Sequence, residues 1–162
     1  MRNTIFALAI LSVTLICCND EEFYNYTDQC IFPESFITPC FSNISEYNSD
    51  RVIITTQTDY LAFQHAIRAS FQNMPCDTAK LPEIDFSKYS LLGIESEGGG
   101  CMVDYQRNLY KDTREKKIIY DVKVTYSGFC FMLIGSWNWV YIPKLQSGYS
   151  VEFRLEQNQV ME

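Results

Sequence analysis

The chain has 162 residues and carries 20 acidic against 13 basic side chains, a formal net charge of −7. An acidic chain without a basic stripe is a poor ligand for nucleic acid, because contacts to phosphate dominate that affinity, so we exclude nucleic acid as a partner. Eleven Tyr, eleven Phe and two Trp residues suit both the faces of a β-sheet and the surfaces at which proteins bind one another.

Residues 1–17 have the pattern of a signal peptide. Arg2 supplies a short basic start, and an apolar run extends from Ile5 to Ile16. A transmembrane helix needs about 20 apolar residues, so a run this short indicates an export signal. The end of the run, Leu15-Ile16-Cys17-Cys18, resembles a bacterial lipobox, which implies cleavage before Cys18 and a lipid anchor on its thiol. The membrane is then a partner through that anchor.

Two alternatives remain open at this boundary. Lipidation of Cys17 would leave the bulky Ile16 at the cleavage point, and an ordinary secretory signal would release a protein with no anchor. Cleavage before Cys18 removes only Arg2 among the charged residues, so the mature chain has a net charge of 12 minus 20, or −8. Several acyl chains on Cys18 would hold it on a bilayer essentially permanently.

Residues 18–50 read as a tether and an irregular lead-in, because they are polar and aromatic with no sustained period. The acidic stretch Asn19-Asp20-Glu21-Glu22 resembles the tethers of surface lipoproteins in the Bacteroidetes group. That likeness implies a location in the outer membrane or at the cell surface, with an orientation toward the periplasm left open.

A β-rich domain is expected over residues 51–156, beginning with a strand and a helix. Residues 51–56 are rich in β-branched side chains and predict a first strand. A helix follows over residues 59–71, with Thr58 as its expected cap. Apolar residues recur on it at helical spacing: Tyr60, Phe63, Ile67 and Phe71.

After Pro82 the sequence predicts only strands, with a tail at residues 157–162. The expected strands are 89–96, 101–110, 117–126, 129–134, 137–142 and 150–156. The third alternates cleanly and is expected to bury one face, made of Ile118, Tyr120, Val122, Val124 and Tyr126. The fold class is therefore mainly β, α+β with one short helix, as an antiparallel sandwich or a partly open barrel.

Five cysteines follow the anchor, and in an exported protein they are expected to form disulfides: Cys30, Cys40, Cys76, Cys101 and Cys130. A hairpin turning near residues 111–116 would place Cys101 opposite Tyr126 and close to Cys130, which favours a Cys101–Cys130 bridge. A Cys30–Cys40 bridge is the second prediction, with Cys40–Cys76 as its alternative.

The segment from Ile84 to Phe153 resembles the C-terminal domain of the PrcB family, lipoproteins that stabilise a protease complex. The resemblance lies in the D-F strand at Asp85-Phe86, the glycine turn at 98–100, the run Trp139-Val140-Tyr141-Ile142-Pro143-Lys144, and the closing Val151-Glu152-Phe153. It implies a β-rich, non-catalytic domain that supports an extracellular protease complex, and hence another protein as partner.

A more distant likeness concerns two expected loops, Glu97-Gly98-Gly99-Gly100 and the stretch with Trp137 and Asn138. Chagasin-type cysteine-protease inhibitors present a glycine loop and a tryptophan loop at one end of a sandwich, so peptidase inhibition is an alternative function. The competing interpretation makes the glycines a turn and buries both Trp137 and Trp139 in the core. A carbohydrate-binding module that uses exposed aromatic residues is a third hypothesis.

The sequence predicts no enzyme, no cofactor and no metal site. The only histidine, His65, is expected to be exposed, although it could in principle form a dyad with Cys76 or Cys130. No C-x-x-C pair and no nucleotide-binding glycine motif occurs. Asp77-Thr78-Ala79 resembles the O-glycosylation acceptor of Bacteroidetes exported proteins, which makes Thr78 a candidate modification site.

Overall fold

A computed structural model of the chain describes residues 23–33, 50–70 and 82–160, with the side chains of residues 67–70 left out. The signal peptide, Cys18, Cys40, Cys76 and Thr78 lie outside these ranges, so the lipid anchor, the Cys40–Cys76 bridge and the modification of Thr78 stay predictions. In the described part, no helix is both long enough and apolar enough to cross a bilayer.

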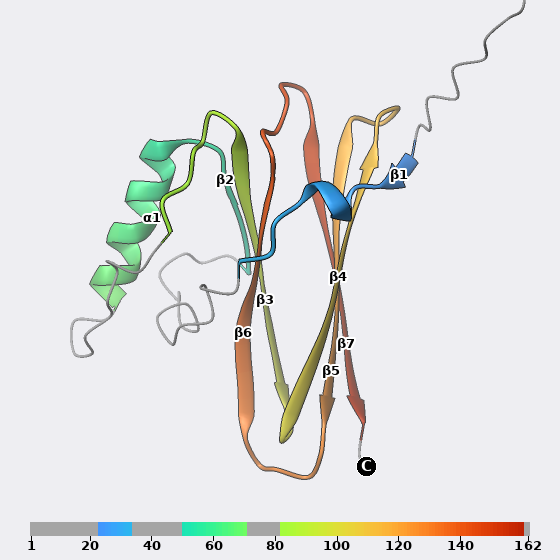
Figure 1. The fold of residues 1–162 in the computed structure, drawn as a ribbon. Helices are drawn as coiled ribbons and strands as arrows, with labels where there is room; N and C mark the ends of the chain where they lie inside the picture. The colour runs from blue at the N-terminus through green and yellow to red at the C-terminus, as the bar shows by residue number, and fades with distance from the viewer. Residues whose placement is uncertain (1–22, 34–49, 71–81, 161–162) are drawn as a thin grey trace, which may run out of the picture.

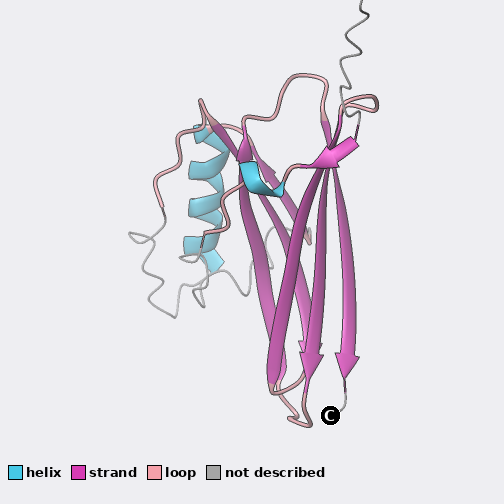
Figure 2. Ribbon diagram, turned by 45° about the vertical axis from the view of Figure 1, so that its right-hand side comes forward, coloured by secondary structure: helices cyan, strands magenta, loops and turns pink. Residues whose placement is uncertain are grey.

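The described residues form two β-sheets that pack face to face, with one α-helix outside them (Figures 1 and 2). The mainly β prediction is confirmed, and the arrangement is a sandwich rather than a barrel. The elements are β1 (Phe23–Asn25), the 3₁₀ helix η1 (Thr27–Gln29), β2 (Arg51–Ile54), α1 (Gln57–Ser70), β3 (Tyr89–Gly99), β4 (Met102–Asp112), β5 (Lys117–Ser127), β6 (Leu133–Pro143) and β7 (Ser150–Val160).

The four-stranded sheet has the order β1-β4-β5-β7, and the three-stranded sheet has the order β2-β3-β6. All neighbours are antiparallel except β5 and β7, which run parallel from Lys117↔Ser150 to Ser127↔Val160. The sheets are therefore antiparallel, as predicted, apart from this one pair. The β5–β7 pair is parallel because β6, which lies between them in the chain, belongs to the other sheet. The chain runs back along β6, and β7 therefore starts at the same end of the sandwich as β5.

Two expected element boundaries also differ. Residues 129–132 of the strand expected at 129–134 lie in the connection before β6. The rest joins the strand expected at 137–142 in one strand, because Gly135 and Ser136 continue the ladder opposite Glu97 and Ser96 instead of turning. Residues 157–160 of the expected tail are part of β7, which extends to Val160 alongside β5.

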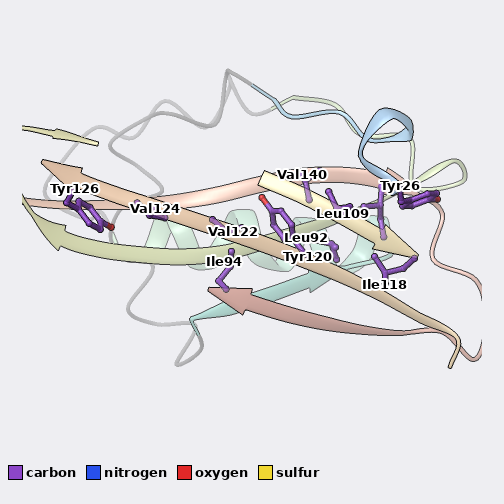
Figure 3. Packing of buried hydrophobic residues seen from close by; sticks show 11 residues of the cluster. Tyr26, Leu92, Ile94, Leu109, Ile118, Tyr120, Val122, Val124, Tyr126 and Val140 are labelled. Carbon is purple, nitrogen blue, oxygen red and sulfur yellow. The ribbon is translucent and has the colours of Figure 1, made fainter. Parts of the chain in front are cut away.

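The main core fills the space between the sheets. The face of β5 predicted from its alternation is buried throughout: Ile118, Tyr120, Val122, Val124 and Tyr126 are each 3% exposed or less. These side chains meet Leu92, Ile94 and Val140 of the facing sheet, in a row that Figure 3 shows between Tyr126 and Tyr26. A fully buried side chain of this size contributes about 1.5–3 kcal/mol, so this cluster is the main source of stability.

A second core lies between α1 and the outer face of the three-stranded sheet. Tyr60 and Phe63 of the helix are 2% and 0% exposed, as their helical spacing predicts. The helix begins earlier than expected, and its cap is Thr56 rather than Thr58. Thr56 Oγ1 accepts a hydrogen bond from the Asp59 N–H (3.1 Å) and donates one to its carboxylate (2.7 Å), a reciprocal arrangement that satisfies a free donor at the helix start.

The Asp85-Phe86 motif has a structural role. Phe86 is buried and packs against Tyr60 with ring centroids 5.4 Å apart. Asp85 Oδ1 accepts a hydrogen bond from the Ser87 N–H (3.0 Å), and Lys88 Nζ lies 2.9 Å from Asp85 Oδ2. The hydrogen bond from the Ser87 hydroxyl, with those from Lys88 and the Ser87 N–H, lowers the pKa of Asp85 to about 2. The motif thus shapes the turn that leads into β3.

Candidate functional site

One end of the sandwich carries a group of exposed apolar side chains, which we name the apolar tip: Met102, Phe129, Phe131, Met132 and Leu133, between 53% and 110% exposed. Phe131 is the most exposed of them, with a side chain as open to water as in an extended peptide. Scattered exposed apolar residues are ordinary, but a contiguous group marks a place where another molecule binds.

The apolar tip is built where two connections between the sheets lie side by side. The turn from β3 to β4 and the connection from β5 to β6 are joined by the disulfide Cys101–Cys130, as predicted. Backbone hydrogen bonds reinforce the joint, from the Gly100 N–H to the Met132 carbonyl (3.0 Å) and from the Cys101 N–H to the Ser127 carbonyl (2.7 Å). The exposed side chains therefore stand on a braced backbone.

The pairing of β4 with β5, from which the disulfide was predicted, has a different register from the expected one. Val103 rather than Cys101 lies opposite Tyr126, so the hairpin pairs with an offset of two residues. Cys101 and Cys130 still come together, with a Cα–Cα distance of 4.9 Å. They meet because Gly128, with a φ of +89°, turns the chain back after β5.

The predicted glycine loop is not a loop. Glu97, Gly98 and Gly99 belong to β3, where they pair with the start of β6, and Gly100 lies in the short turn to β4. Close approach explains the glycines: a Cβ on Gly98 would lie 2.4 Å from the Tyr126 ring, and a Cβ on Gly100 would lie 2.9 Å from the Ser127 carbonyl oxygen. These residues shape the apolar tip from beneath rather than forming its binding surface.

The predicted tryptophan loop is also strand. Trp137 and Trp139 lie in β6, 7% and 4% exposed, and stack with ring centroids 5.1 Å apart beneath α1. The competing interpretation, that both tryptophans are buried, is confirmed. A chagasin-like inhibitory end consequently loses its tryptophan anchor.

Asn138 points the other way, into the space between the sheets, and is 1% exposed. Its Oδ1 accepts a hydrogen bond from Arg107 Nε of β4 (3.0 Å), and its Nδ2 donates one to Ser96 Oγ of β3 (3.1 Å). Asn138 is thus a link between the two sheets and has no free polar group to offer a ligand at the surface.

No charged residue lies in the segments that meet at the apolar tip. Residues 98–103 and 125–136 contain no Asp, Glu, Lys or Arg. The cores of protein interfaces are depleted of charge in the same way and enriched in Phe and Met. Surfaces that bind anionic lipids, by contrast, carry clusters of Lys and Arg. In its Phe and Met residues and its lack of charge, the apolar tip is similar in composition to the cores of protein interfaces.

Cys30 is a free thiol, so the predicted Cys30–Cys40 disulfide is wrong. Its Sγ–H donates to the Tyr26 carbonyl oxygen (3.3 Å), and its side chain packs on the main core. Burial raises the pKa of this thiol to about 12, so it stays protonated and unreactive at neutral pH. The alternative Cys40–Cys76 bridge lies outside the described residues and stays a prediction.

Of the residues considered for catalysis, the structure describes His65 and Cys130, whereas Cys76 lies outside the described residues. His65 is exposed on α1, as expected, and Cys130 is held in the disulfide with Cys101, which removes it as a nucleophile. Within residues 23–33, 50–70 and 82–160, no three His, Cys, Asp or Glu side chains gather as a metal ion would require.

Comparison with protein-family models, with curated proteins and with solved structures finds no match for this chain. The apolar tip was missed by the sequence analysis, which assigned residues 129–134 to a strand. The sequence carried one signal: the run from Phe129 to Ile134 is apolar at every position, directly after Gly128, whereas a strand such as β5 alternates between apolar and polar residues.

Proposed function

We propose that this protein is an exported, lipid-anchored binding protein that holds another exported protein through its apolar tip. The observation that carries the proposal is the braced, uncharged group of exposed apolar side chains around Phe131. Phe and Met in such a group serve as anchors that fill pockets on a partner. The resemblance to the PrcB family supports a subunit of an extracellular protease complex as that partner.

The position of the apolar tip fits such a task. β1 pairs with the far end of β4, where Phe23 lies opposite Asp112. Met102 starts the same strand, ten residues away, so at about 3.3 Å per residue the tip lies about 33 Å from β1. Figure 1 shows β1 and the connection from β5 to β6 at opposite ends of the long strands.

An anchor at Cys18 would then place the apolar tip away from the bilayer. The chain from Cys18 to Phe23 spans at most about 18 Å, because an extended residue covers no more than about 3.6 Å. With β1 tied that closely to the membrane and the strands upright, the tip faces the surrounding compartment. Another protein is the partner that such a surface can reach.

Replacing Cys18 by Ala is expected to move the protein from the membrane fraction to the soluble fraction, because the acyl chains supply nearly all of the membrane affinity. Cell fractionation followed by immunoblotting measures the change. A Cys17→Ala variant is the control and should remain membrane-bound. Unchanged fractionation of the Cys18→Ala variant would contradict the anchor without affecting the tip.

Replacing Phe131 by Ser is expected to leave the free energy of unfolding within about 0.5 kcal/mol of the wild type, because the side chain is exposed. Binding to the partner is expected to weaken roughly thirty-fold, as for an interface anchor worth about 2 kcal/mol. The measurement is photo-crosslinking in intact cells: benzoylphenylalanine at position 131 detects the partner, and the same probe at position 129 compares crosslinking of the chain with and without Phe131→Ser. The same probe at Leu61, which is 47% exposed on α1, is the matched control.

A discrete crosslinked species at position 131, absent at position 61 and weakened by Phe129→Ser, supports the proposal. Vesicle flotation tests the lipid alternative, with the unlipidated mature chain and either phosphatidylcholine or phosphatidylglycerol vesicles. Flotation that depends on Phe131 would show a membrane-inserting tip and would overturn the proposed protein partner.

A further inference from the structure

β2 has a side chain that faces inward and yet is exposed. Val52 and Ile54 pack beneath α1 and are 4% and 1% exposed. Side chains alternate along a strand, so Arg51 and Ile53 point to the opposite face of the three-stranded sheet, toward the second sheet. Ile53 is nevertheless 45% exposed. The four-stranded sheet therefore does not extend far enough to cover β2.

The four-stranded sheet ends at β7. Among the described residues, β7 pairs with β5 on one side, and its second edge pairs with no strand. An open groove of about 510 Å³ lies along this edge, between β7 and β2. Ile53, Val151 and Phe153 give it an apolar lining, and the backbone N–H and C=O groups of the β7 edge border it.

We propose that this groove is a second binding site, which accepts an extended segment of another protein as an added strand next to β7. Neighbouring strands lie about 4.8 Å apart, so an added strand would stand beside β7 and opposite β2. Its inward side chains would cover Ile53 and extend the main core. An extended polypeptide is the ligand whose own alternating N–H and C=O groups match those of a free edge.

The charges around the groove indicate the chemistry of that segment. Lys117 Nζ lies 3.0 Å from a Glu152 carboxylate oxygen, and Arg154 Nε lies 2.7 Å from the other. Glu115 Oε2 also lies 2.9 Å from Lys117 Nζ, and Asp50 Oδ2 lies 3.5 Å from Nε of Arg51, which lines the groove. Each cation around the groove thus has a carboxylate partner, so the groove offers no unbalanced charge. The bound segment is therefore expected to carry uncharged, apolar side chains at every second position.

A second copy of this chain is a less suitable occupant. Charged side chains on an edge strand oppose edge-to-edge pairing of identical sheets, and β7 carries Glu152, Arg154 and Glu156 on its outer face. The mature chain also has a net charge of 12 minus 20, or −8, which repels a copy of itself.

The test uses the unlipidated mature chain, residues 18–162, as the target for phage-displayed random ten-residue peptides. The selected peptides are expected to carry apolar residues at alternate positions, and the strongest is then synthesised and titrated by calorimetry. Ile53→Thr is expected to weaken its binding roughly tenfold, because the substitution removes apolar contact area and keeps a β-branched shape. Leu61→Gln, on the exposed face of α1, is the control and should bind normally.

A matched peptide with N-methyl groups on alternate amides keeps every side chain and loses the donors of one edge. Its binding is expected to fall at least a hundredfold, a result that needs no change to the protein. Selected peptides without alternation, binding that survives Ile53→Thr but not Phe131→Ser, or a dimer mass in sedimentation would each overturn the proposal. The two surfaces have separate variants, so failure here leaves the proposed function of the tip untouched.

Discussion

Gly93→Ala is expected to destabilise the protein by about 3 kcal/mol, at the upper end of the usual cost of overpacking a core. A Cβ at Gly93 of β3 would lie 2.3 Å from the Trp139 ring. That ring cannot move away, because Phe63 of α1 packs against it edge-on, with centroids 5.4 Å apart, and Trp137 stacks beside it. The clash thus sits where the helix meets the three-stranded sheet.

Urea unfolding followed by tryptophan fluorescence measures the effect, since both tryptophans report on this core. Gly135→Ala is the matched control, because it is also a strand glycine and its Cβ would meet nothing closer than Glu97 Oε2 at 3.9 Å. It should change the free energy of unfolding by no more than about 0.5 kcal/mol. Equal losses in the two variants would show that the Trp139 ring does not restrict position 93.

Removing the Cys101–Cys130 disulfide is expected to cost about 3–4 kcal/mol. The two cysteines are 29 residues apart in the sequence, and closing a loop of that length restricts the unfolded chain by about that amount in the chain-entropy model. For a domain of this size such a loss lowers the Tm by about 10 °C. The double variant Cys101→Ala/Cys130→Ala tests it by thermal denaturation.

The same double variant should also weaken crosslinking at position 131, because the turn beneath the apolar tip loses its covalent brace. Cys30→Ala is the control: it removes the free thiol and should lower the Tm by only a few degrees. A loss below about 1 kcal/mol in the double variant would mean that the backbone hydrogen bonds of Gly100 and Cys101 suffice to hold this end together.

The parts of the fold that the sequence predicted well are those with a local period. The alternation in β5 identified its buried face, and the helical spacing of Tyr60 and Phe63 identified the inner face of α1. The Cys101–Cys130 bridge was also found, because a hairpin brings its two ends together whatever the rest of the chain does. In each case the residues concerned are neighbours in one element or in two consecutive ones.

The candidate site was predicted poorly, for a reason visible in its residues. Trp137 and Gly98 were candidates for binding loops, with close packing as the competing interpretation, because aromatic and glycine residues suit both. Phe131 was expected in a strand, because an apolar run reads as buried. The unbroken apolar run after Gly128 was the one local signal, and by itself it does not show whether such a run is covered.

By itself, the sequence determined the order of the helix and most strands and the apolar faces of β5 and α1, because side-chain direction follows from the backbone period alone. The tertiary structure decided which sheet each strand joins, why β7 runs parallel to β5, and why Phe131 and Ile53 are left in water. Whether an apolar side chain is covered depends on elements far away in the chain. The exposed tip and the open β7 edge therefore became visible only once the two sheets were assembled.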